Sequence, residues 1–498
     1  MSEQHKQSDN RPRPTTEAFR NFVSQGWAPR SDARPERAPV AGYAAARRDA
    51  VSAQFPGERL VVPSGGLKIR SNDTDYTFRP HSAFAHLTGF RGDCEPDAVL
   101  VLHPLAEGGH EAVVYVRPLA GRDTDEFFAD ARSGEFWVGP RARLEDLEAE
   151  LGIAARHIDQ QPDALAKDAG ATAIRVVRDA DTDIAVLVDQ VRRAAAGTDQ
   201  AEVSIEADDE LAAYLSHLRM VKDEWEVDQL RAAVAATRVG FEAVIAELGA
   251  AVERGRGERW IEGVFALHAR HQGNGVGYDS ICASGDHATT LHWIDNSGDV
   301  SPGDLVLLDA GVEVDSLYTA DITRTLPVDG TFTEAQREIY DVVYAAQQAG
   351  MAAIRPGAKF SDIHAAAIEV IAERLHHWGL LPDEVTVADT LDAESGQYHR
   401  RWMVHGTSHH LGLDVHDCAL ATREQYLDAE LTPGMVLTVE PGLYFKADDL
   451  LAPERFRGHG VRIEDDVLVT ETGFENLSAG MPSTSADVEA WIARVQER

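Results

Sequence analysis

Two patterns of apolar and polar positions alternate in the first part of the chain. From Arg59 to about Ala196, short apolar runs alternate with stretches of helical periodicity. The runs include RLVVPS, AVLVLHP and EAVVYVRP, whereas RLEDLEAELG has apolar residues three and four positions apart. Short apolar runs are typical of buried strands, and the second spacing is typical of one helix face. The alternation predicts an α/β domain.

A long amphipathic helix is predicted from about Asp223 to Leu248. Its apolar positions recur at steps of three, four or seven residues and include Val227, Leu230, Val234 and Phe241. One apolar face of this kind packs against a core. Lys222, Glu224 and Glu226 stand at its start and are expected to form a solvated first turn, where glutamates complement the helix dipole.

Beyond this helix the periodicity changes again. The segments LVLLDAGVEV, DITRTLPV, MVLTVEPGLYF and VRIEDDVLVT are rich in β-branched and apolar residues, and they predict strands. Two amphipathic segments, TEAQREIYDVVYAAQQAGMAAI and FSDIHAAAIEVIAERLHHWG, predict helices. Periodicity by itself therefore predicts an α+β fold for this half of the chain.

Length and local composition predict the domain boundaries. At 498 residues the chain exceeds what one hydrophobic core usually supports. Residues 1–40 are rich in Arg, Pro, Ser, Asp and Glu without periodicity, and they predict a mobile arm. A polar, acidic interval near Asp199 to Asp209 predicts the connection between an α/β domain at 41–205 and a catalytic domain at 206–498.

Charge and hydropathy exclude several classes of partner. A net charge of -36 would repel a phosphate backbone, so no nucleic-acid partner is expected. The chain has no apolar run of about 18 residues and no apolar core near its start, so neither a membrane span nor a signal peptide is expected. Cys94, Cys282 and Cys418 are few and widely separated, which fits a reducing compartment. The expected location is the cytoplasm.

The candidate chemistry lies in the second half of the chain. Four carboxylates and one imidazole follow or interrupt predicted strands: Asp309, Asp321, His409, Glu440 and Glu464. Such oxygen-rich ligands suit paired Mn²⁺, Co²⁺ or Zn²⁺ better than a thiolate-bound zinc. Two ions roughly 3.5–4 Å apart can share a water, lower its pKa and direct hydroxide at a carbonyl. Taken singly, Asp309 could be a turn residue and Asp321 an ion-pair partner of Arg324.

The order of these motifs resembles one known family. The segments LLDAG, ADITRT, HGTSHHLGLDVHD, TVEPGLYF and GVRIEDD are similar, in this order, to those of the pita-bread metallopeptidases in the aminopeptidase P and prolidase branch. The resemblance extends from about Arg59 to Leu477. It implies a C-terminal pita-bread domain, a curved antiparallel sheet with outer helices, preceded by a smaller α/β domain like that of creatinase and prolidase. The stretch between Asp309 and Asp321 is one residue longer than the common spacing, and a longer hairpin is expected to absorb it.

The resemblance also implies roles for individual residues. It assigns Asp321 and Glu464 as bridging carboxylates, Asp309 to one metal ion, and His409 with Glu440 to the other. Arg462 would orient the carboxylates, and Glu440 is the candidate acceptor of the proton from water. The residues expected to act on the substrate or its surroundings are His292, His405, His416, Glu440 and Arg462. Tyr444 is expected in the wall of the proline pocket.

The predicted function is that of a Xaa-Pro aminopeptidase. Such an enzyme releases the first residue of peptides that have proline in second position, by means of a metal-bridging hydroxide between two divalent ions. Mn²⁺ is the expected ion, with Co²⁺ or Zn²⁺ as alternatives. A prolidase acting on Xaa-Pro dipeptides and a metal-free relative serving as a binding module remain open. The resemblance also implies subunit contacts through the N-terminal domain, and hence a homo-oligomer, a dimer or a tetramer. No H-E-x-x-H, P-loop or G-x-S-x-G motif supports another chemistry.

Overall fold

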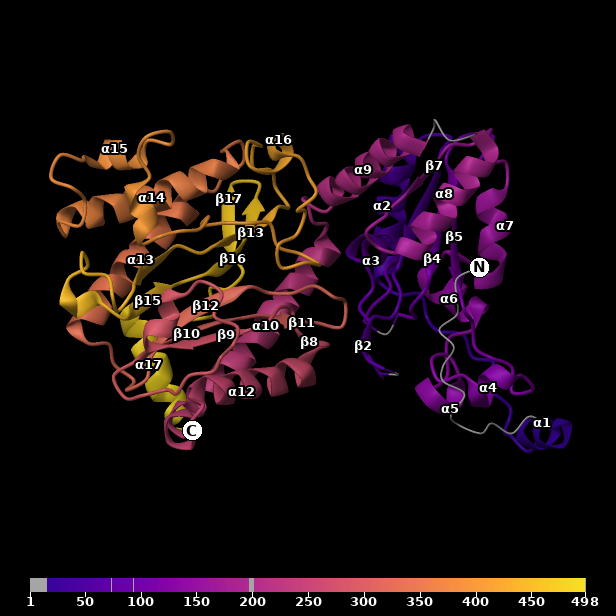
Figure 1. Ribbon diagram of the computed structural model, residues 1–498, viewed down its shortest axis with the longest axis horizontal. Coiled ribbons are helices and arrows are strands. Elements are labelled where there is room, and N and C mark those ends of the chain that lie inside the picture. The colour runs from indigo at the N-terminus through magenta and orange to yellow at the C-terminus, as the bar shows by residue number, and fades with distance from the viewer. Residues whose placement is uncertain (1–15, 73, 93, 197–200, 498) are drawn as a thin grey trace. The chain divides into compact units, whose positions relative to one another are not determined.

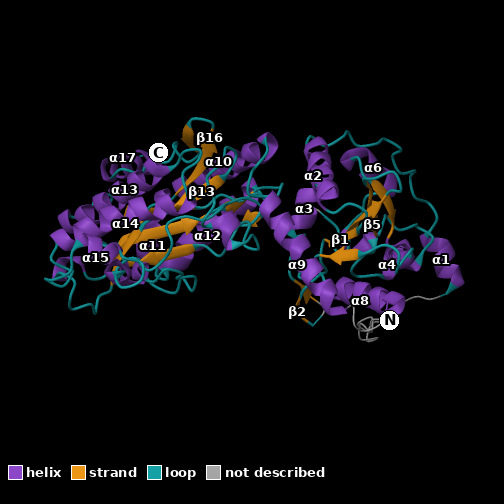
Figure 2. Cartoon of the chain, turned by 90° about the horizontal axis from the view of Figure 1, so that it is seen from above, coloured by secondary structure: helices purple, strands orange, loops and turns teal. Residues whose placement is uncertain are grey.

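The computed structural model describes residues 16–72, 74–92, 94–196 and 201–497. The chain divides into two compact units, residues 1–215 and 216–498. Helices border the strands in each of them (Figure 2). In the described residues no helix has the length and apolar character needed to cross a membrane.

The first unit is built around a five-stranded mixed sheet. The strand order is β6-β5-β4-β1-β7, with β1 (Arg59–Pro63), β4 (Val99–Pro104), β5 (His110–Val116), β6 (Ala154–His157) and β7 (Ile174–Val176). β4 runs antiparallel to β1 and β5, whereas β6 and β7 run parallel to their neighbours. Apolar residues of β1, β4 and β5 pack against α7 (Gln161–Ala166) and α8 (Thr182–Ala196). The predicted α/β domain is therefore confirmed.

Other helices and a short hairpin complete this unit. They are α1 (Glu17–Val23), α2 (Val40–Gln54), β2 (Ile69–Ser71), β3 (Thr74–Asp75), α3 (Ser82–Thr88), α4 (Asp125–Ala129), α5 (Glu135–Val138), α6 (Leu144–Leu151) and α9 (Ala201–Leu218). The predicted arm of residues 1–40 begins outside the described residues. Within it, Phe19 of α1 contacts Phe128 edge to face, with 5.2 Å between the ring centroids. The predicted connection at 199–209 also lies partly outside the described residues, and the chain is helical from Ala201.

Short antiparallel strands form the centre of the second unit. Two three-stranded sheets have the orders β12-β10-β9 and β13-β16-β17, and β14 pairs with β15 and β11 with β8. The strands are β8 (Gly275–Val276), β9 (Ile281–Ser284), β10 (Leu305–Ala310), β11 (Val312–Glu313), β12 (Ile322–Pro327), β13 (Val436–Val439), β14 (Gly442–Phe445), β15 (His459–Arg462), β16 (Asp465–Thr470) and β17 (Gly473–Asn476). The Glu464 amide donates to the Thr323 carbonyl at 3.1 Å and joins the two sheets.

Helices lie on both sides of these strands. α13 (Glu334–Ala353) and α14 (Phe360–His377) pack on one side, and α10 (Glu224–Ala246) and α12 (Gly257–Gln272) on the other (Figure 1). The remaining helices are α11 (Leu248–Arg254), α15 (Val387–Leu391), α16 (Arg423–Tyr426) and α17 (Ser485–Gln496). This arrangement agrees with the predicted pita-bread domain and with the predicted helices.

The start of α10 differs from the prediction of a solvated turn. Asp223 and Glu226 form a reciprocal cap, each side chain accepting from the other's backbone amide at 3.0 Å. Glu226 is buried and also accepts from the Tyr318 hydroxyl at 2.7 Å. The Lys222 side chain is fully buried, and its ammonium lies 3.6 Å from Asp417. The expectation was wrong for Lys222 and Glu226, because tertiary partners bury these charged groups.

Candidate metal centre

The β10–β12 hairpin places the first two candidate ligands. Asp309 lies near the end of β10 and pairs with Thr323, while Asp321 immediately precedes β12. The two aspartates are therefore diagonal neighbours across the hairpin. The Tyr278 hydroxyl lies 2.7 Å from Asp309 Oδ1 and 2.5 Å from Asp321 Oδ1. One phenolic proton is thus shared by the two carboxylates.

A tight turn joins the segments that carry the two aspartates. The Leu317 amide donates to the Val314 carbonyl at 2.8 Å, and the Val314 amide donates to the Tyr318 carbonyl at 3.0 Å. Leu317 has a left-handed backbone with φ of 74°. Asp309 is in register with Thr323 of β12 in regular antiparallel pairing. The expectation that this hairpin is one residue longer than the common spacing stays a prediction.

A segment alongside β13 brings His409 beside Glu440. The His409 amide donates to Thr438 Oγ1 at 3.1 Å, and the Thr438 amide donates back to the His409 carbonyl at 2.9 Å. The Glu440 amide then donates to the Thr407 carbonyl at 2.9 Å. Since the two segments run antiparallel, His409 and Glu440 face the same region. His409 Nε2 lies 3.7 Å from Glu440 Oε1.

Glu464 and Arg462 enter from the strands that follow. The Thr323 hydroxyl donates to Glu464 Oε2 at 2.7 Å. Arg462 donates from Nε to Thr323 Oγ1 at 3.2 Å and from Nη2 to Asp309 Oδ2 at 2.5 Å. Arg462 therefore fixes the orientation of one candidate ligand directly and of Glu464 through Thr323.

Three of the predicted ligands form a compact set of donor atoms. Asp321, His409 and Glu464 each offer an atom, and these atoms lie within 4.8 Å of one another. His409 Nε2 is 3.2 Å from Asp321 Oδ2. Oxygen and imidazole ligands at this spacing fit a divalent ion. Glu440 and Asp309 border the set through their contacts with His409 and Tyr278.

Burial raises the pKa of most carboxyls in this cluster. It raises the pKa of Glu464 well above its usual range, and the charges of Asp321 and Glu440 add to the effect. It raises the pKa of Asp309 against the opposing charge of Arg462. The pKa of Glu440 rises to about 7, mainly through burial. Buried like charges of this kind favour either protons or a cation.

His409 is oriented for ligation through Nε2. Its Nδ1 lies 3.1 Å from the His410 carbonyl. A carbonyl only accepts, so Nδ1 carries the proton and Nε2 faces Asp321. Burial lowers the pKa of His409, but the hydrogen bond with Asp321 and the charge of Glu440 outweigh it and raise the pKa to about 9. Asp321 has a lowered pKa, because the hydrogen bond with His409 overcomes the effect of burial.

His405 belongs to a chain of hydrogen bonds that ends at Arg462. Its Nδ1 donates to the Gly406 carbonyl at 2.6 Å, and its Nε2 lies 2.8 Å from the Tyr444 hydroxyl. Arg462 Nη1 donates to the same hydroxyl at 3.0 Å. Burial, assisted by the charge of Arg462, lowers the pKa of His405 to about 3. His405 therefore stays neutral and accepts the Tyr444 proton.

The two other predicted imidazoles are exposed at the edge of the cluster. The His416 ring packs edge to face on His409, with 4.5 Å between the ring centroids. His292 lies in an irregular segment after β9. Its charge contributes to the lowered pKa of both His405 and His416, after the larger effect of burial. All the predicted site residues thus lie in one region of the second unit.

Two family models match the chain in the order of its two units. The model "Aminopeptidase P, N-terminal domain" matches residues 44–176, and "Metallopeptidase family M24" matches residues 228–471. Xaa-Pro aminopeptidase 2 of Streptomyces coelicolor is 52% identical over 476 residues, which are 95% of this chain and 95% of that protein. The chain belongs to the Xaa-Pro aminopeptidase family. Membership in a metallopeptidase family implies a divalent metal ion as cofactor.

More distant members of the family agree along nearly the whole chain. The Xaa-Pro aminopeptidase of Escherichia coli is 33% identical over 91% of this chain and 98% of its own. A solved structure of E. coli aminopeptidase P, a variant in complex with substrate, has a TM-score of 0.78 and 30% identity. The superposition covers 93% of this chain and 100% of the E. coli chain.

Two residues of the cluster are not among those predicted from the sequence. Tyr278, which contacts both aspartates, lies between β8 and β9 in a segment without a recognisable pattern, so no sequence signal indicated it. Thr323 could have been found, because residues two apart on a strand share a face and Thr323 follows Asp321 by two. Its hydroxyl connects Arg462 to Glu464.

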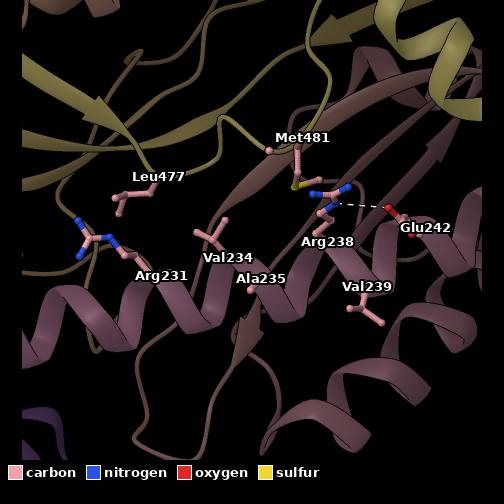
Figure 3. Close-up of a pocket in the computed structure, with 9 residues that line it drawn as sticks. Arg231, Val234, Ala235, Arg238, Val239, Glu242, Leu477 and Met481 are labelled. Carbon is pink, nitrogen blue, oxygen red and sulfur yellow. Dashed lines mark hydrogen bonds and ion pairs between the residues drawn. The ribbon is translucent and has the colours of Figure 1, made fainter.

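A groove elsewhere in the second unit contains none of the predicted site residues. It has a volume of about 450 Å³ and lies between α10 and the segment after β17 (Figure 3). Its lining residues are Arg231, Val234, Ala235, Arg238, Val239, Glu242, Leu477, Gly480 and Met481. Arg231 pairs with Glu475 at 2.8 Å, and Arg238 with Glu242 at 3.3 Å. Both cationic groups are thus already neutralised by neighbouring glutamates.

Proposed function

We propose that this chain hydrolyses the bond between the first residue of a peptide and a proline in second position. The convergence of Asp321, His409 and Glu464 in a member of the Xaa-Pro aminopeptidase family is the observation that carries the proposal. A prolyl nitrogen has no N–H, so a protease that binds its substrate as an added strand loses a hydrogen bond there. A site that instead positions the bond by a metal centre does not depend on that hydrogen bond.

The proposal includes two divalent ions, with Mn²⁺ as the expected metal. Asp309, Asp321, His409, Glu440 and Glu464 would hold these ions, and Asp321 and Glu464 would be shared between them. The excess of buried carboxylates in the cluster supports the proposal, because their negative charge would be balanced by the positive charge of two divalent ions. When bound, such a pair lowers the pKa of a water so that it attacks a carbonyl at neutral pH.

The other side chains are proposed to handle protons and substrate. Glu440 is the proposed acceptor of the proton from water, because its carboxylate lies in the cluster itself, 3.7 Å from His409 Nε2. His292 and His416 are proposed to donate to the carbonyl oxygen or the leaving nitrogen. His405 and Arg462 are proposed to hold Tyr444 in the pocket wall, through the contacts described above.

A comparison of two substrates tests this function. The protein is freed of metal with a chelator, and hydrolysis of a Xaa-Pro-Xaa tripeptide and a Xaa-Pro dipeptide is measured with and without added Mn²⁺. We expect Mn²⁺-dependent release of the first residue from the tripeptide. Cleavage of the dipeptide alone would identify a prolidase. No cleavage of either with Mn²⁺, Co²⁺ or Zn²⁺ would leave only the binding-module alternative.

A homo-oligomer is also part of the proposal. Three consecutive side chains of α5 are exposed, namely Phe136, Trp137 and Val138 at 59%, 49% and 54%. Exposed apolar groups of this kind favour contact with a further copy of the chain. Light scattering coupled to size exclusion should give a dimer or tetramer. A Trp137→Ser variant should shift the mass toward the monomer.

A further inference from the structure

A single buried carboxylate anchors the segment that carries His292. Glu258, in the first turn of α12, is fully buried. Its Oε1 accepts from the Ser284 amide and His287 Nδ1, both at 2.8 Å. Its Oε2 accepts from Trp293 Nε1 at 2.9 Å and from the Gly298 amide at 2.6 Å. The four donors come from the beginning, the middle and the end of residues 284–298, the His292 segment.

The packing of this segment is built around that carboxylate. The His287 ring stacks on the Trp293 ring, with 3.9 Å between centroids and 24° between planes. A Cβ at Gly298 would lie 2.7 Å from His287 Nδ1 and 2.9 Å from Glu258 Cδ. A larger residue at this position would therefore push the carboxylate away from its donors. Gly298 has to be a glycine for the cluster to close.

The same segment also contacts the strands of the candidate metal centre. Its first turn, Gly285–Thr289, packs against β14 and β15, which carry Tyr444 and Arg462. The contact is close, since a Cβ at Gly460 of β15 would lie 1.9 Å from the Ala288 carbonyl oxygen. A shift of the His292 segment would therefore displace the strands that carry Tyr444 and Arg462.

His292 itself is exposed and lies outside any helix or strand. Its neighbour Trp293 is held by the bond to Glu258. An exposed side chain on an irregular segment owes its position to the anchors of that segment rather than to its own packing. The packing of residues 285–289 of the same segment on β14 and β15 places His292 in the surroundings of the site.

We propose that Glu258 is a positioning residue for the reaction, which holds the His292 segment so that the His292 imidazole faces the substrate. The inference rests on the proposed function. A carboxylate suits this role because all four neighbours are donors, and it has only acceptor atoms. The amide of a glutamine would point its NH₂ group at two of these donors and break their hydrogen bonds.

A double-mutant cycle tests the inference. In the Mn²⁺-loaded protein, Glu258→Gln is expected to lower kcat/KM for the tripeptide by about tenfold to a hundredfold, because a small displacement of a catalytic group is costly. Metal content should be unchanged. In a His292→Ala background the same substitution should change kcat/KM by less than about twofold, since nothing is left to position. A merely structural role would give the same loss in both backgrounds.

A matched pair of tryptophan variants covers the case in which Glu258→Gln does not fold. Trp293→Phe removes one donor to Glu258 and keeps the ring. Trp260→Phe, in the helix that carries Glu258, removes instead the hydrogen bond from Trp260 to Glu247 at 3.0 Å. Trp293→Phe should lower kcat/KM and be silent in the His292→Ala background, whereas Trp260→Phe should not lower it. Hydrogen exchange of residues 284–298 should accelerate in Trp293→Phe and Glu258→Gln only.

The outcomes separate this inference from the proposed function. Two results would overturn the role of Glu258 and leave the proposed function intact. One is a loss of kcat/KM in Glu258→Gln that is equally large in the His292→Ala background, and the other is full activity of Glu258→Gln. Absence of cleavage by the unaltered protein overturns the proposed function and this inference together.

Discussion

The two faces of strands β12 and β16 differ in their buried charge: on one face the charges pair, and on the other carboxylates are in excess. On one face, Arg324 of β12 pairs with Asp465 of β16 at 2.6 Å, and both side chains are almost fully buried. Further hydrogen bonds complete this pair: Arg324 donates to the carbonyls of Glu464, Met481 and Pro482, and Asp465 accepts from Gln347 and Asn476. On the other face lie Asp321 and Glu464, which border the same strands.

The first face, on which the charges pair, is called the balanced face. The second has far more negative than positive charge and is called the unbalanced face. Asp321 and Glu464 are joined there by Asp309 and Glu440, against one guanidinium and one imidazole. A buried ion pair with all its hydrogen bonds made is a structural element, whereas uncompensated buried carboxylates are costly and mark a functional site. Charge balance, rather than burial or strand identity, therefore separates the candidate metal centre from the scaffold that supports it.

The largest expected effect follows from removing a central ligand on the unbalanced face. Asp321→Ala should abolish metal binding and lower kcat by about a thousandfold or more, because the metal supplies several kcal/mol of transition-state stabilisation. The fold should persist, since one of several repelling carboxylates is removed. Metal analysis, activity and circular dichroism check this. Asp315→Ala, the same change at an exposed position of the same hairpin, is the control. A fully active Asp321→Ala would contradict the assignment.

Removing one partner of the ion pair on the balanced face should lower the stability of the fold. Arg324→Met is expected to lower the free energy of unfolding by about 3–5 kcal/mol, because it leaves Asp465 buried without its partner. A second change, Asp465→Leu, should restore most of the loss by removing the orphaned charge. Chemical denaturation of the two variants and the parent measures this. A double variant as unstable as the single one would mean that the pair acts through its shape rather than its charge.

The free energy of unfolding of the metal-free protein should depend on pH through Glu440 of the unbalanced face. Glu440 has a pKa of about 7 in the folded chain, above the value of an unfolded glutamate. Above pH 7 its ionisation therefore destabilises the metal-free fold, and the penalty disappears as pH falls from 7 toward 4.5. Glu440→Gln should accordingly stabilise the metal-free protein at pH 8, by about 1.4 kcal/mol per unit of raised pKa.

Denaturation of chelator-treated parent and variant at several pH values measures this gain. It should shrink between pH 7 and 5. A gain that is the same at pH 8 and pH 5 would show that Glu440 carries no charge in the metal-free fold.

The smallest effect is expected from a residue that supports the unbalanced face without being a ligand. Tyr278→Phe removes the hydroxyl shared by Asp309 and Asp321 and should weaken metal affinity by about tenfold. Titration with Mn²⁺ measures this. Tyr340→Phe is the control, since that buried hydroxyl donates to the Ser483 carbonyl instead. Equal affinities of the two variants would remove Tyr278 from the site.

The sequence predicts contacts best where a motif carries its own local geometry. Because Arg462 and Glu464 are two residues apart, strand alternation predicts that they share a face, and both contact Thr323. It predicts partners that are distant in sequence less well. Its spacing allows Asp321 as a partner of Arg324, but Arg324 pairs with Asp465, 141 positions away. Alternation places Arg324 on the face opposite Asp321, and only the packing of β12 near β16 supplies Asp465 as its partner.

The sequence by itself determined the periodicity of the helices and strands, the order of the five motifs and hence the family. These properties are local, because each depends on residue types and spacings within one segment. The tertiary structure alone decided that Tyr278 joins two aspartates, that Lys222 is buried beside Asp417, and that Glu258 collects four donors from one loop. Such contacts depend on how segments far apart in the chain pack together, and a buried polar group takes whichever partner that packing brings within reach.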